Sequence, residues 1–399
     1  MEFGITRTDQ DLLDEFRRYL DALVADGTVA AEPPLVRPDH AMDPADIAAR
    51  RAFLRRLGND GWLGLAWPTE LGGRGLSYYS QWLIIEELSW RKLPEMLMSV
   101  TMVGPTLMLA GSAEHQRQFL PGIRAGEIEF CLGFSEPGAG TDLAALQTRA
   151  VRDGEDYLID GQKVYTTGAQ YATHIWLATR TGAPDSRHRG ITLFIVPIDT
   201  PGITVRPMIT QADYRTNEVF FDRVRVPASA RVGEHDGGWR VIALSLDLER
   251  NLNANIQVRE LRELAEWADT PDPADPSGAP PADDDAVAVE LGRLATRVEI
   301  VRLLSAQVAT LLTDKQPLAA EASMAKVWSS ETFQELPALG LDLLGPAGTR
   351  SVGSAGAPIH GLVELDYRES PVRKFAAGTN EVQRDIIAQR GLGLPRSRR

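Results

Sequence analysis

The chain has 399 residues, 43% of them hydrophobic, which is enough for a large core organised as two or three domains or layers. Its net charge of −13 argues against nucleic acid as the main partner. A single cysteine, Cys131, excludes an intrachain disulfide, and the six histidines lack ligand spacing, so no metal site is expected. The polar N-terminus and the short longest apolar run (96–111) predict a soluble, cytoplasmic protein without membrane contact.

The first third of the chain has helical periodicity. Apolar residues recur at helical spacing over 9–24, 45–58 and 78–91. The turn-rich stretch AWPTELGGRG (66–75) separates the last two. We therefore predict an N-terminal helical domain over residues 1–125.

The middle of the chain has strand character. Short alternating or β-branched runs, split by Gly, Asp and Pro, cover 128–136, 149–168, 173–181, 191–199, 203–208 and 217–227. Within them, RDGEDY (152–157) is a hairpin signal. We therefore predict a middle β-domain over residues 126–232.

Helical periodicity returns after residue 236. Asp236 can cap a helix whose apolar stripe includes Val241, Leu244 and Leu248. Further helices are expected over 286–313, 319–343 and 380–390. Between the first two helical stretches, residues 268–286 are rich in Pro and Asp and predict a loop. This helical region spans 233–399.

Several motifs occur in a characteristic order along the chain. They are GWLGLAWPTELGG (61–73), GSAEHQRQFLPGIRAGE (111–127), FSEPGAGTD (134–142), DGQKVYTTGAQYATHIWLATRT (160–181), FDRVRVPASARVGEHDGGW (221–239) and AAGTNEVQRDIIAQRGLGLPR (376–396). Together they resemble the acyl-CoA dehydrogenases over nearly the whole chain. The resemblance implies an α+β fold with an N-terminal helical domain, a middle β-domain and a C-terminal four-helix bundle, and FAD as the cofactor.

Two middle-domain segments are implicated in binding. Gly138 and Gly140 in FSEPGAGTD let backbone N–H groups approach a ligand, although a tight turn between strand and loop is the simpler reading. The resemblance places Tyr165 on the flavin and the Thr167 hydroxyl near its N5 atom. The cofactor-binding residues that it implies are Leu132, Phe134, Ser135, Gly140, Thr141, Tyr165, Thr166, Thr167, Gly345, Gly378, Thr379 and Glu381.

The turn in KFAAGTNEVQR (374–384) poses the question of the catalytic base. Asn380 and Gln383 are spaced as a capping box. Many family members carry a Glu directly before the Gly-Thr pair, where this chain has Ala377. The backbone N–H of Ala377 can still donate to a thioester oxygen. Glu381 is the nearest carboxylate, but its simpler role is that of a first-turn residue favoured by the helix dipole.

A second helix offers the alternative base. In one branch of the family the proton acceptor is the Glu of an LDLER stretch, which here is Glu249. The resemblance also places Asp247 and Arg250 near the substrate, and Thr141 near the thioester end of CoA. By the helical period Asp247 faces a different direction from Glu249. The expected reaction is α,β-dehydrogenation of an acyl-CoA to the trans-2-enoyl-CoA, with flavin N5 accepting the hydride.

The chain departs from the family in one region. No R-x-x-F-G stretch follows the base helix, and Asp342 stands where Gln or Glu is usual. The RGLGLPR ending resembles the heteromeric steroid or branched-acyl type of subunit. Three readings stay open: a dehydrogenase passing electrons to an electron-transfer flavoprotein, a flavin oxidase or monooxygenase on a carrier-bound or other substrate, and a partner subunit with little activity alone. The assembly is either a homodimer or homotetramer, or a heterotetramer with a second such chain.

Overall fold

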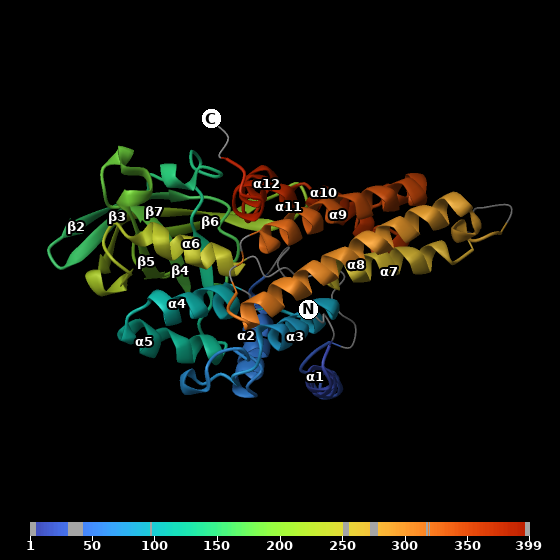
Figure 1. Ribbon diagram of the computed structural model, residues 1–399, viewed down its shortest axis with the longest axis horizontal. Coiled ribbons are helices and arrows are strands. Elements are labelled where there is room, and N and C mark those ends of the chain that lie inside the picture. The colour runs from blue at the N-terminus through green and yellow to red at the C-terminus, as the bar shows by residue number, and fades with distance from the viewer. Residues whose placement is uncertain are drawn as a thin grey trace. The chain divides into compact units, whose positions relative to one another are not determined.

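The structure is a computed structural model that describes residues 5–30, 43–95, 98–249, 255–271, 278–316, 318 and 320–395. The chain forms two compact units, each assembled from separate segments of sequence (Figure 1). We call residues 1–37, 77–93 and 250–399 the helical unit, and residues 38–76 and 94–249 the sheet unit. Among the described residues, no helix is long and apolar enough to cross a membrane.

The helical unit is built around three helices, α7, α8 and α9, that lie side by side (Figure 1). Leu294 and Val298 of α8 and Leu336 of α9 form a buried cluster between them. The helices of this unit are α1 (Arg7–Ala25), α3 (Tyr78–Trp90), α7 (Asn255–Ala268), α8 (Asp285–Thr313), α9 (Glu321–Leu344), α10 (Leu362–Glu369), α11 (Val372–Phe375) and α12 (Asn380–Ile386), the last followed by a π-helical turn, Ile387–Gly391.

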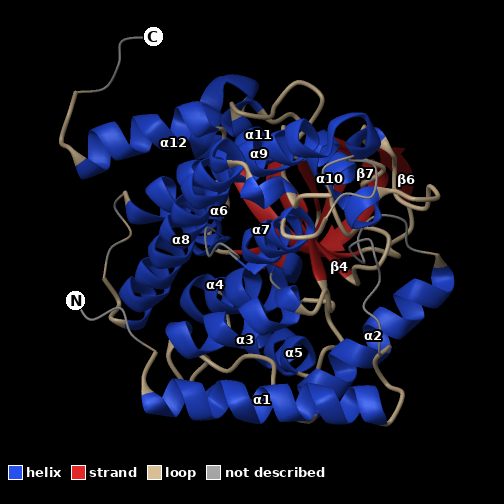
Figure 2. Cartoon of the chain, turned by 90° about the vertical axis from the view of Figure 1, so that its right-hand side faces the viewer, coloured by secondary structure: helices blue, strands red, loops and turns tan. Residues whose placement is uncertain are grey.

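The N-terminal helix α1 packs against α3 of the same unit (Figure 2). The Thr6 side chain accepts a hydrogen bond from the Asp9 N–H at the helix start, which satisfies one of the free N–H groups there. Phe16, Leu20 and Leu23, at helical spacing, are almost completely buried. The helical unit is discontinuous in sequence because α3 also packs on α7 and α8. The domain bounds expected at residues 125 and 232 stay predictions.

Over the residues described, the sheet unit combines one mixed sheet with four α-helices. Its helices are α2 (Pro44–Asn59), α4 (Gly104–Ala110), α5 (Ala113–Arg124) and α6 (Gly238–Glu249), with a π-helical turn, Met98–Val103, before α4. Its strands are β1 (Phe130–Gly133), β2 (Arg149–Asp153), β3 (Asp156–Lys163), β4 (His174–Arg180), β5 (Ile191–Pro197), β6 (Ile203–Ile209), β7 (Arg215–Pro227) and β8 (Arg231–Val232). Their order is β6-β7-β3-β2-β4-β5-β8, and β1 pairs with β4 in parallel.

The core of the sheet comes from alternating apolar positions. Ile159, Ile175, Phe194 and Val224 are fully buried in one cluster, which also encloses Cys131. The hairpin expected at RDGEDY is confirmed: β2 and β3 pair antiparallel around Gly154, whose φ is +66°. The predicted succession of helices, sheet and helices is likewise confirmed.

Two sequence expectations differ from the structure in detail. Helix α7, which ends where the Pro- and Asp-rich stretch begins, was not among the expected helices. The Asp236 carboxylate, expected to cap α6, accepts a hydrogen bond from the Thr181 hydroxyl at 2.5 Å. The backbone of Asp236 is left-handed, with a φ of +62°, in the loop before the helix.

Candidate functional site

The glycine loop, residues 134–142, forms a tight turn at the end of β1. Glu136 and Ala139 exchange two backbone hydrogen bonds of 3.0 and 3.1 Å around the exposed tip at Gly138. A Cβ added at Gly138 or Gly140 would meet nothing within 4 Å, so packing within this chain does not require glycine there. Open space beside both glycines is what close approach of a ligand to the backbone needs.

A buried ion pair holds the glycine loop. The Nζ of Lys163, which is fully buried on β3, donates to Glu136 Oε1 at 2.7 Å and to the Phe134 carbonyl at 3.0 Å. The Glu136 carboxylate also accepts from the backbone N–H groups of Gln147 (2.6 Å) and Thr148 (2.8 Å). With every group satisfied, the pair fixes where the loop leaves the sheet.

The burial of this pair shifts both pKa values. Loss of water lowers the pKa of Lys163 to about 8, against the opposing attraction of Glu136. Burial alone would raise the pKa of Glu136, but the Lys163 charge and the hydrogen bonds to the carboxylate outweigh it and hold that pKa below its ordinary value. At neutral pH the loop is therefore held by a charged pair.

The segment 165–167 follows β3 and lies next to the glycine loop, because the Val164 N–H donates to the Ser135 carbonyl at 2.9 Å. The structure thus brings together two segments that the sequence placed at one site. Tyr165 has a φ of +57°, and its side chain is 67% exposed. Burial of the ring therefore does not account for this backbone conformation. Non-glycine residues in this backbone region are strained and concentrate at functional sites.

The two threonines that follow differ in environment. Thr166 is fully buried, and its hydroxyl has no hydrogen-bond partner among the described residues. Its backbone is fixed by Asn217, whose carbonyl accepts from the Thr166 N–H and whose side chain donates to the Thr166 carbonyl, both at 2.9 Å. Thr167 is half-buried, and its N–H donates back to the Tyr165 carbonyl at 3.0 Å. This turn presents Tyr165 and Thr167 on a rigid base.

In the helical unit, the turn 376–379 exposes backbone rather than a carboxylate. Ala377 has a φ of +52° and Gly378 a φ of +85°, and both residues are exposed. In the part of the chain that the structure describes, the Ala377 N–H makes no hydrogen bond. The turn therefore offers a donor, and neither Ala376 nor Ala377 can take a proton.

A polar network from α9 fixes this turn. The Nζ of Lys326 donates to Asn380 Oδ1 at 2.6 Å and to the Lys374 carbonyl at 2.9 Å, and the Ser330 hydroxyl donates to the same Asn380 oxygen at 3.0 Å. Burial lowers the pKa of Lys326 to about 8. The network holds both ends of the turn in place.

The capping box expected from Asn380 and Gln383 is wrong. The cap is Thr379, whose side chain accepts from the Val382 N–H at 3.3 Å. Asn380 accepts a hydrogen bond from Lys326, and Gln383 accepts one from the Ser323 hydroxyl at 2.7 Å. Both side chains thus serve tertiary contacts, which a local sequence pattern does not reveal.

Glu381 behaves as a first-turn residue of α12. It is exposed, and hydrogen bonds from its own backbone N–H and from Thr379 lower its pKa. The helix start stabilises the ionised form of such a carboxylate. This favours the simpler role that the sequence allowed for Glu381 over a role as proton acceptor.

Helix α6, which ends at Glu249, is held on the sheet by a buried serine. The Ser245 hydroxyl accepts from Trp176 Nε1 of β4 at 3.3 Å, lies 3.3 Å from the Thr106 hydroxyl of α4, and donates to the Val241 carbonyl. Asp247, on the same helix, is half-buried. The side chain of Glu249 and the whole of Arg250 lie outside the described residues.

The remaining predicted site residues lie at different depths. Leu132 is half-buried on β1 and Phe134 only 7% exposed, whereas Thr141 is exposed. Gly345 ends α9 with a φ of +55°, and an added Cβ there meets nothing within 4 Å. Asp342 is exposed on the last turn of the same helix.

Sequence reasoning did not single out Lys163, Glu136 or Lys326, although these side chains hold the site's turns. One indication was available for Lys163, which stands on a strand where buried apolar residues alternate. A lysine facing a core needs a partner, and Glu136 of the glycine loop is the one the fold supplies.

The residues present fit a flavin nucleotide. In the sheet unit, two glycines with open space beside them (Gly138 and Gly140), the exposed ring of Tyr165 and the exposed hydroxyl of Thr141 make a surface that packing within the unit leaves unexplained. No group of His, Cys, Asp and Glu among the described residues could hold a metal ion.

Comparison with known proteins gives a consistent result over the whole chain. Residues 6–127, 131–224 and 236–392 match the models of the N-terminal, middle and C-terminal domains of acyl-CoA dehydrogenase. The chain is 40% identical to the acyl-CoA dehydrogenase FadE26 of Mycobacterium tuberculosis over 355 residues, covering 88% of this chain and 89% of the other.

Two solved structures superpose over the full length of both chains. One is described as "Tcur3481-Tcur3483 steroid ACAD", with a TM-score of 0.88 and 35% identity. The other is the ChsE4-ChsE5 complex from Mycobacterium tuberculosis, with a TM-score of 0.87 and 37% identity. Each covers 100% of this chain and 100% of its own.

Proposed function

Because the chain belongs to the acyl-CoA dehydrogenase family, whose members are FAD-dependent oxidoreductases, we propose that it oxidises an acyl-CoA thioester to the trans-2-enoyl-CoA with Glu249 as the α-proton acceptor. One observation carries the assignment of the base. The turn before α12 is held in a left-handed conformation at Ala377 and exposes a backbone donor, yet it contains no group that can take a proton. The LDLER stretch at the end of α6 supplies the carboxylate that the turn lacks.

The chain's own residues divide the chemistry. The α-proton of a thioester is weakly acidic, so the enolate must be stabilised as it forms. The Ala377 N–H donates to the thioester oxygen, and such a donor typically contributes about 3 kcal/mol to the transition state. Glu249 takes the proton. FAD, when bound, would supply the acceptor for the hydride that leaves the β-carbon.

The residues of the sheet unit orient the reactants. Tyr165 offers its exposed ring for stacking, and Ser135, Thr141 and Thr167 offer hydroxyl groups as donors. In the helical unit, Gly378 and Thr379 complete the turn, and Gly345 gives open backbone at the end of α9. Leu132, Phe134, Gly140, Thr166 and Glu381 belong to the same proposed cofactor site. Asp247 and Arg250 are assigned to the substrate.

The relatives support an assignment of the acyl group and the assembly. Solved structures at 35–37% identity include a steroid acyl-CoA dehydrogenase and a two-component complex, and we assign this chain a bulky, steroid-type acyl-CoA and a second, different subunit. The chain's own support is the acidic, Pro-rich stretch 268–286 where other members carry R-x-x-F-G. An electron-transfer flavoprotein is the assigned electron acceptor.

The test is anaerobic mixing of the flavin-loaded protein, alone and co-expressed with a candidate partner chain, with a panel of straight-chain and steroid acyl-CoAs. We expect loss of flavin absorbance with the steroid thioesters, and a rate about 10²–10⁴-fold lower for Glu249→Gln. Glu234→Gln, which changes an exposed carboxylate in the loop before α6, is the matched control and should bleach the flavin at the native rate.

Three results would change the proposal. An unchanged bleaching rate in Glu249→Gln removes that residue as the base. Full FAD loading and turnover by the chain alone removes the two-subunit assembly. Oxygen consumption without an added electron acceptor favours an oxidase.

A further inference from the structure

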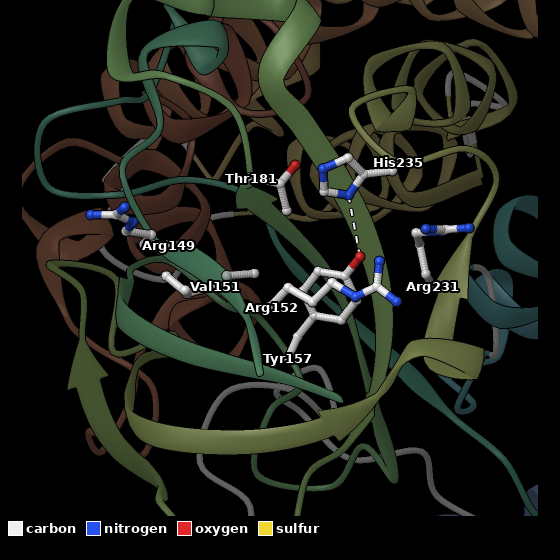
Figure 3. A pocket seen from close by; sticks show the side chains of 8 residues that line it. Arg149, Val151, Arg152, Tyr157, Thr181, Arg231 and His235 are labelled. Atoms are coloured by element: carbon white, nitrogen blue, oxygen red, sulfur yellow. Dashed lines mark hydrogen bonds between the residues drawn. The ribbon is translucent and has the colours of Figure 1, made fainter. Parts of the chain in front are cut away.

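A cavity of about 340 Å³ opens in the sheet unit (Figure 3). It is lined by Arg149, Ala150, Val151, Arg152, Tyr157, Thr181, Arg231 and His235. Tyr157 lies eight residues before Tyr165 along the same chain segment, which at strand spacing is roughly 25 Å. The cavity is therefore distinct from the turn at Tyr165.

The cavity arises because β2 leaves its neighbour. Arg149 pairs with Arg180 of β4, and no further residue of β2 pairs with that strand. Beyond this point the space beside β2 is bordered by Thr181 after β4, Arg231 of β8 and His235 in the loop that follows. The sheet topology thus gathers basic side chains from two separate segments, β2 and residues 231–235, around one opening.

The three arginines retain most of their hydrogen-bonding capacity. Arg152 uses only Nε, donating to the Gly154 carbonyl at 3.1 Å, and Arg231 uses only Nε, donating to the Gly233 carbonyl at 3.1 Å. Arg149 has no side-chain partner within the described ranges. The terminal nitrogens of all three remain available, and Figure 3 shows Arg149 and Arg231 on opposite sides of the opening.

Three carboxylates close in sequence to the lining residues differ in their partners. Asp153 and Asp156 both pair with Arg225, at 2.6 and 3.0 Å. Asp236 accepts the Thr181 hydroxyl at 2.5 Å, and its other oxygen lies 3.7 Å from His235 Nε2. Three arginines thus line the cavity, and among the described residues the carboxylate of Asp236 contacts that lining, so the local charge is positive in a chain whose net charge is −13.

The wall of the cavity is also fixed. Tyr157, only 2% exposed, shares a hydrogen bond of 3.2 Å with His235 Nδ1, drawn in Figure 3. The ring of His235 is thus held between the Tyr157 hydroxyl and Asp236. Val151, 45% exposed, adds an apolar surface at the rim.

We propose that this pocket binds a small anion carrying a diphosphate group. Planar guanidinium groups bind phosphate oxygens two at a time, and three arginines line this one cavity. The volume is at the lower end for small-molecule sites and suits a diphosphate or a compact nucleoside diphosphate. The acidic remainder of the chain disfavours a long polyanion. The site is independent of the proposed dehydrogenase reaction.

The test is calorimetric titration of the flavin-loaded, full-length protein with inorganic pyrophosphate, ADP and CoA at low ionic strength. The variants are Arg152→Gln and Arg231→Gln. Arg223→Gln is the matched control, because this exposed arginine of the same sheet unit lies outside the pocket and its replacement changes the net charge equally. We expect the Kd for pyrophosphate to rise about tenfold in each pocket variant and to stay unchanged in the control.

The three ligands separate the sources of the diphosphate. Tighter binding of ADP than of pyrophosphate identifies a nucleotide, and equal binding identifies the free anion; both support the pocket. The proposal fails if the native protein binds none of them, if Arg223→Gln weakens binding as much as the pocket variants, or if only CoA binds and acyl-CoA displaces it. A single-stranded oligonucleotide that displaces pyrophosphate would also overturn the small-anion assignment.

Discussion

Two buried lysines hold the two exposed turns of the candidate site, one in each unit, and they do so with different partners. Lys163 supports the glycine loop through the carboxylate of Glu136, and Lys326 supports the turn before α12 through the amide of Asn380. Each also donates to a backbone carbonyl, of Phe134 or Lys374. The lysine of the sheet unit therefore has a charged partner, whereas the lysine of the helical unit has a neutral one.

The difference between these partners predicts which lysine substitution should destabilise the fold more. Removing a lysine from an ion pair leaves a buried carboxylate without its counter-charge, whereas removing one from an amide leaves a neutral group with another donor. Glu136 is 8% exposed, and Asn380, at 2%, keeps its hydrogen bond from Ser330. The following experiments test this contrast.

The largest effect is expected for Lys163→Met. The free energy of unfolding should fall by about 3–5 kcal/mol, because Glu136 is left charged and unpaired. Urea unfolding measures the loss. The double variant with Glu136→Gln should recover part of it, and FAD affinity should fall with the single change as the glycine loop loosens. Equal stability of the single and double variants would contradict the role of the pair.

Lys326→Met should cost less, about 1–3 kcal/mol, because the Asn380 amide is neutral and keeps the Ser330 donor. The same urea measurement applies. A loss as large as that of Lys163→Met would show that the two lysines are equivalent and that the distinction between their partners is irrelevant.

Gly378→Ala should cost about 1 kcal/mol, because its φ of +85° disfavours a side chain and the new Cβ would lie 2.5 Å from Gln383 Nε2. Gly140→Ala is the contrasting variant, because an added Cβ there meets nothing within 4 Å. It should leave the unfolding free energy within about 0.5 kcal/mol and weaken flavin binding in a titration. Normal flavin affinity in Gly140→Ala would argue against a ligand beside that glycine.

The smallest expected effect is a pH slope. The pKa of Lys326 is about 8 in the folded chain and 10.5 ordinarily, so between these values the unfolded state binds more protons and stability rises with pH. Below pH 8 both states are protonated and this contribution is flat. Comparing urea midpoints of the native chain and Lys326→Met across this range should show a shallower rise in the variant. Parallel curves would mean that Lys326 does not titrate there.

The element order and the location of most segments could be predicted from the sequence, because periodicity and turn residues act locally. Helix α7 was overlooked although Val258, Leu261, Leu264 and Ala268 are spaced for one helical face, since the adjacent Pro-rich stretch dominated the interpretation. The site residues themselves stay predictions, with the side chain of Glu249 the most consequential.

What the sequence could not supply is the support behind the turns. Lys163 and Glu136 are 27 residues apart, and no local pattern indicates that they meet. The left-handed backbone conformations of Tyr165 and Ala377 could not be predicted from the sequence either, because neither residue type favours that conformation. Both arise from tertiary contacts that hold a strained turn in place.

The early departure of β2 from β4 also bears on solubility. A strand with unpaired N–H and C=O groups along one side is a template on which another extended chain can assemble. Here that side carries Arg152 and Asp153, both exposed, so an incoming strand would have to strip water from charged groups before pairing. The arginines that make the cavity attractive to an anion would then also keep neighbouring molecules from joining their sheets.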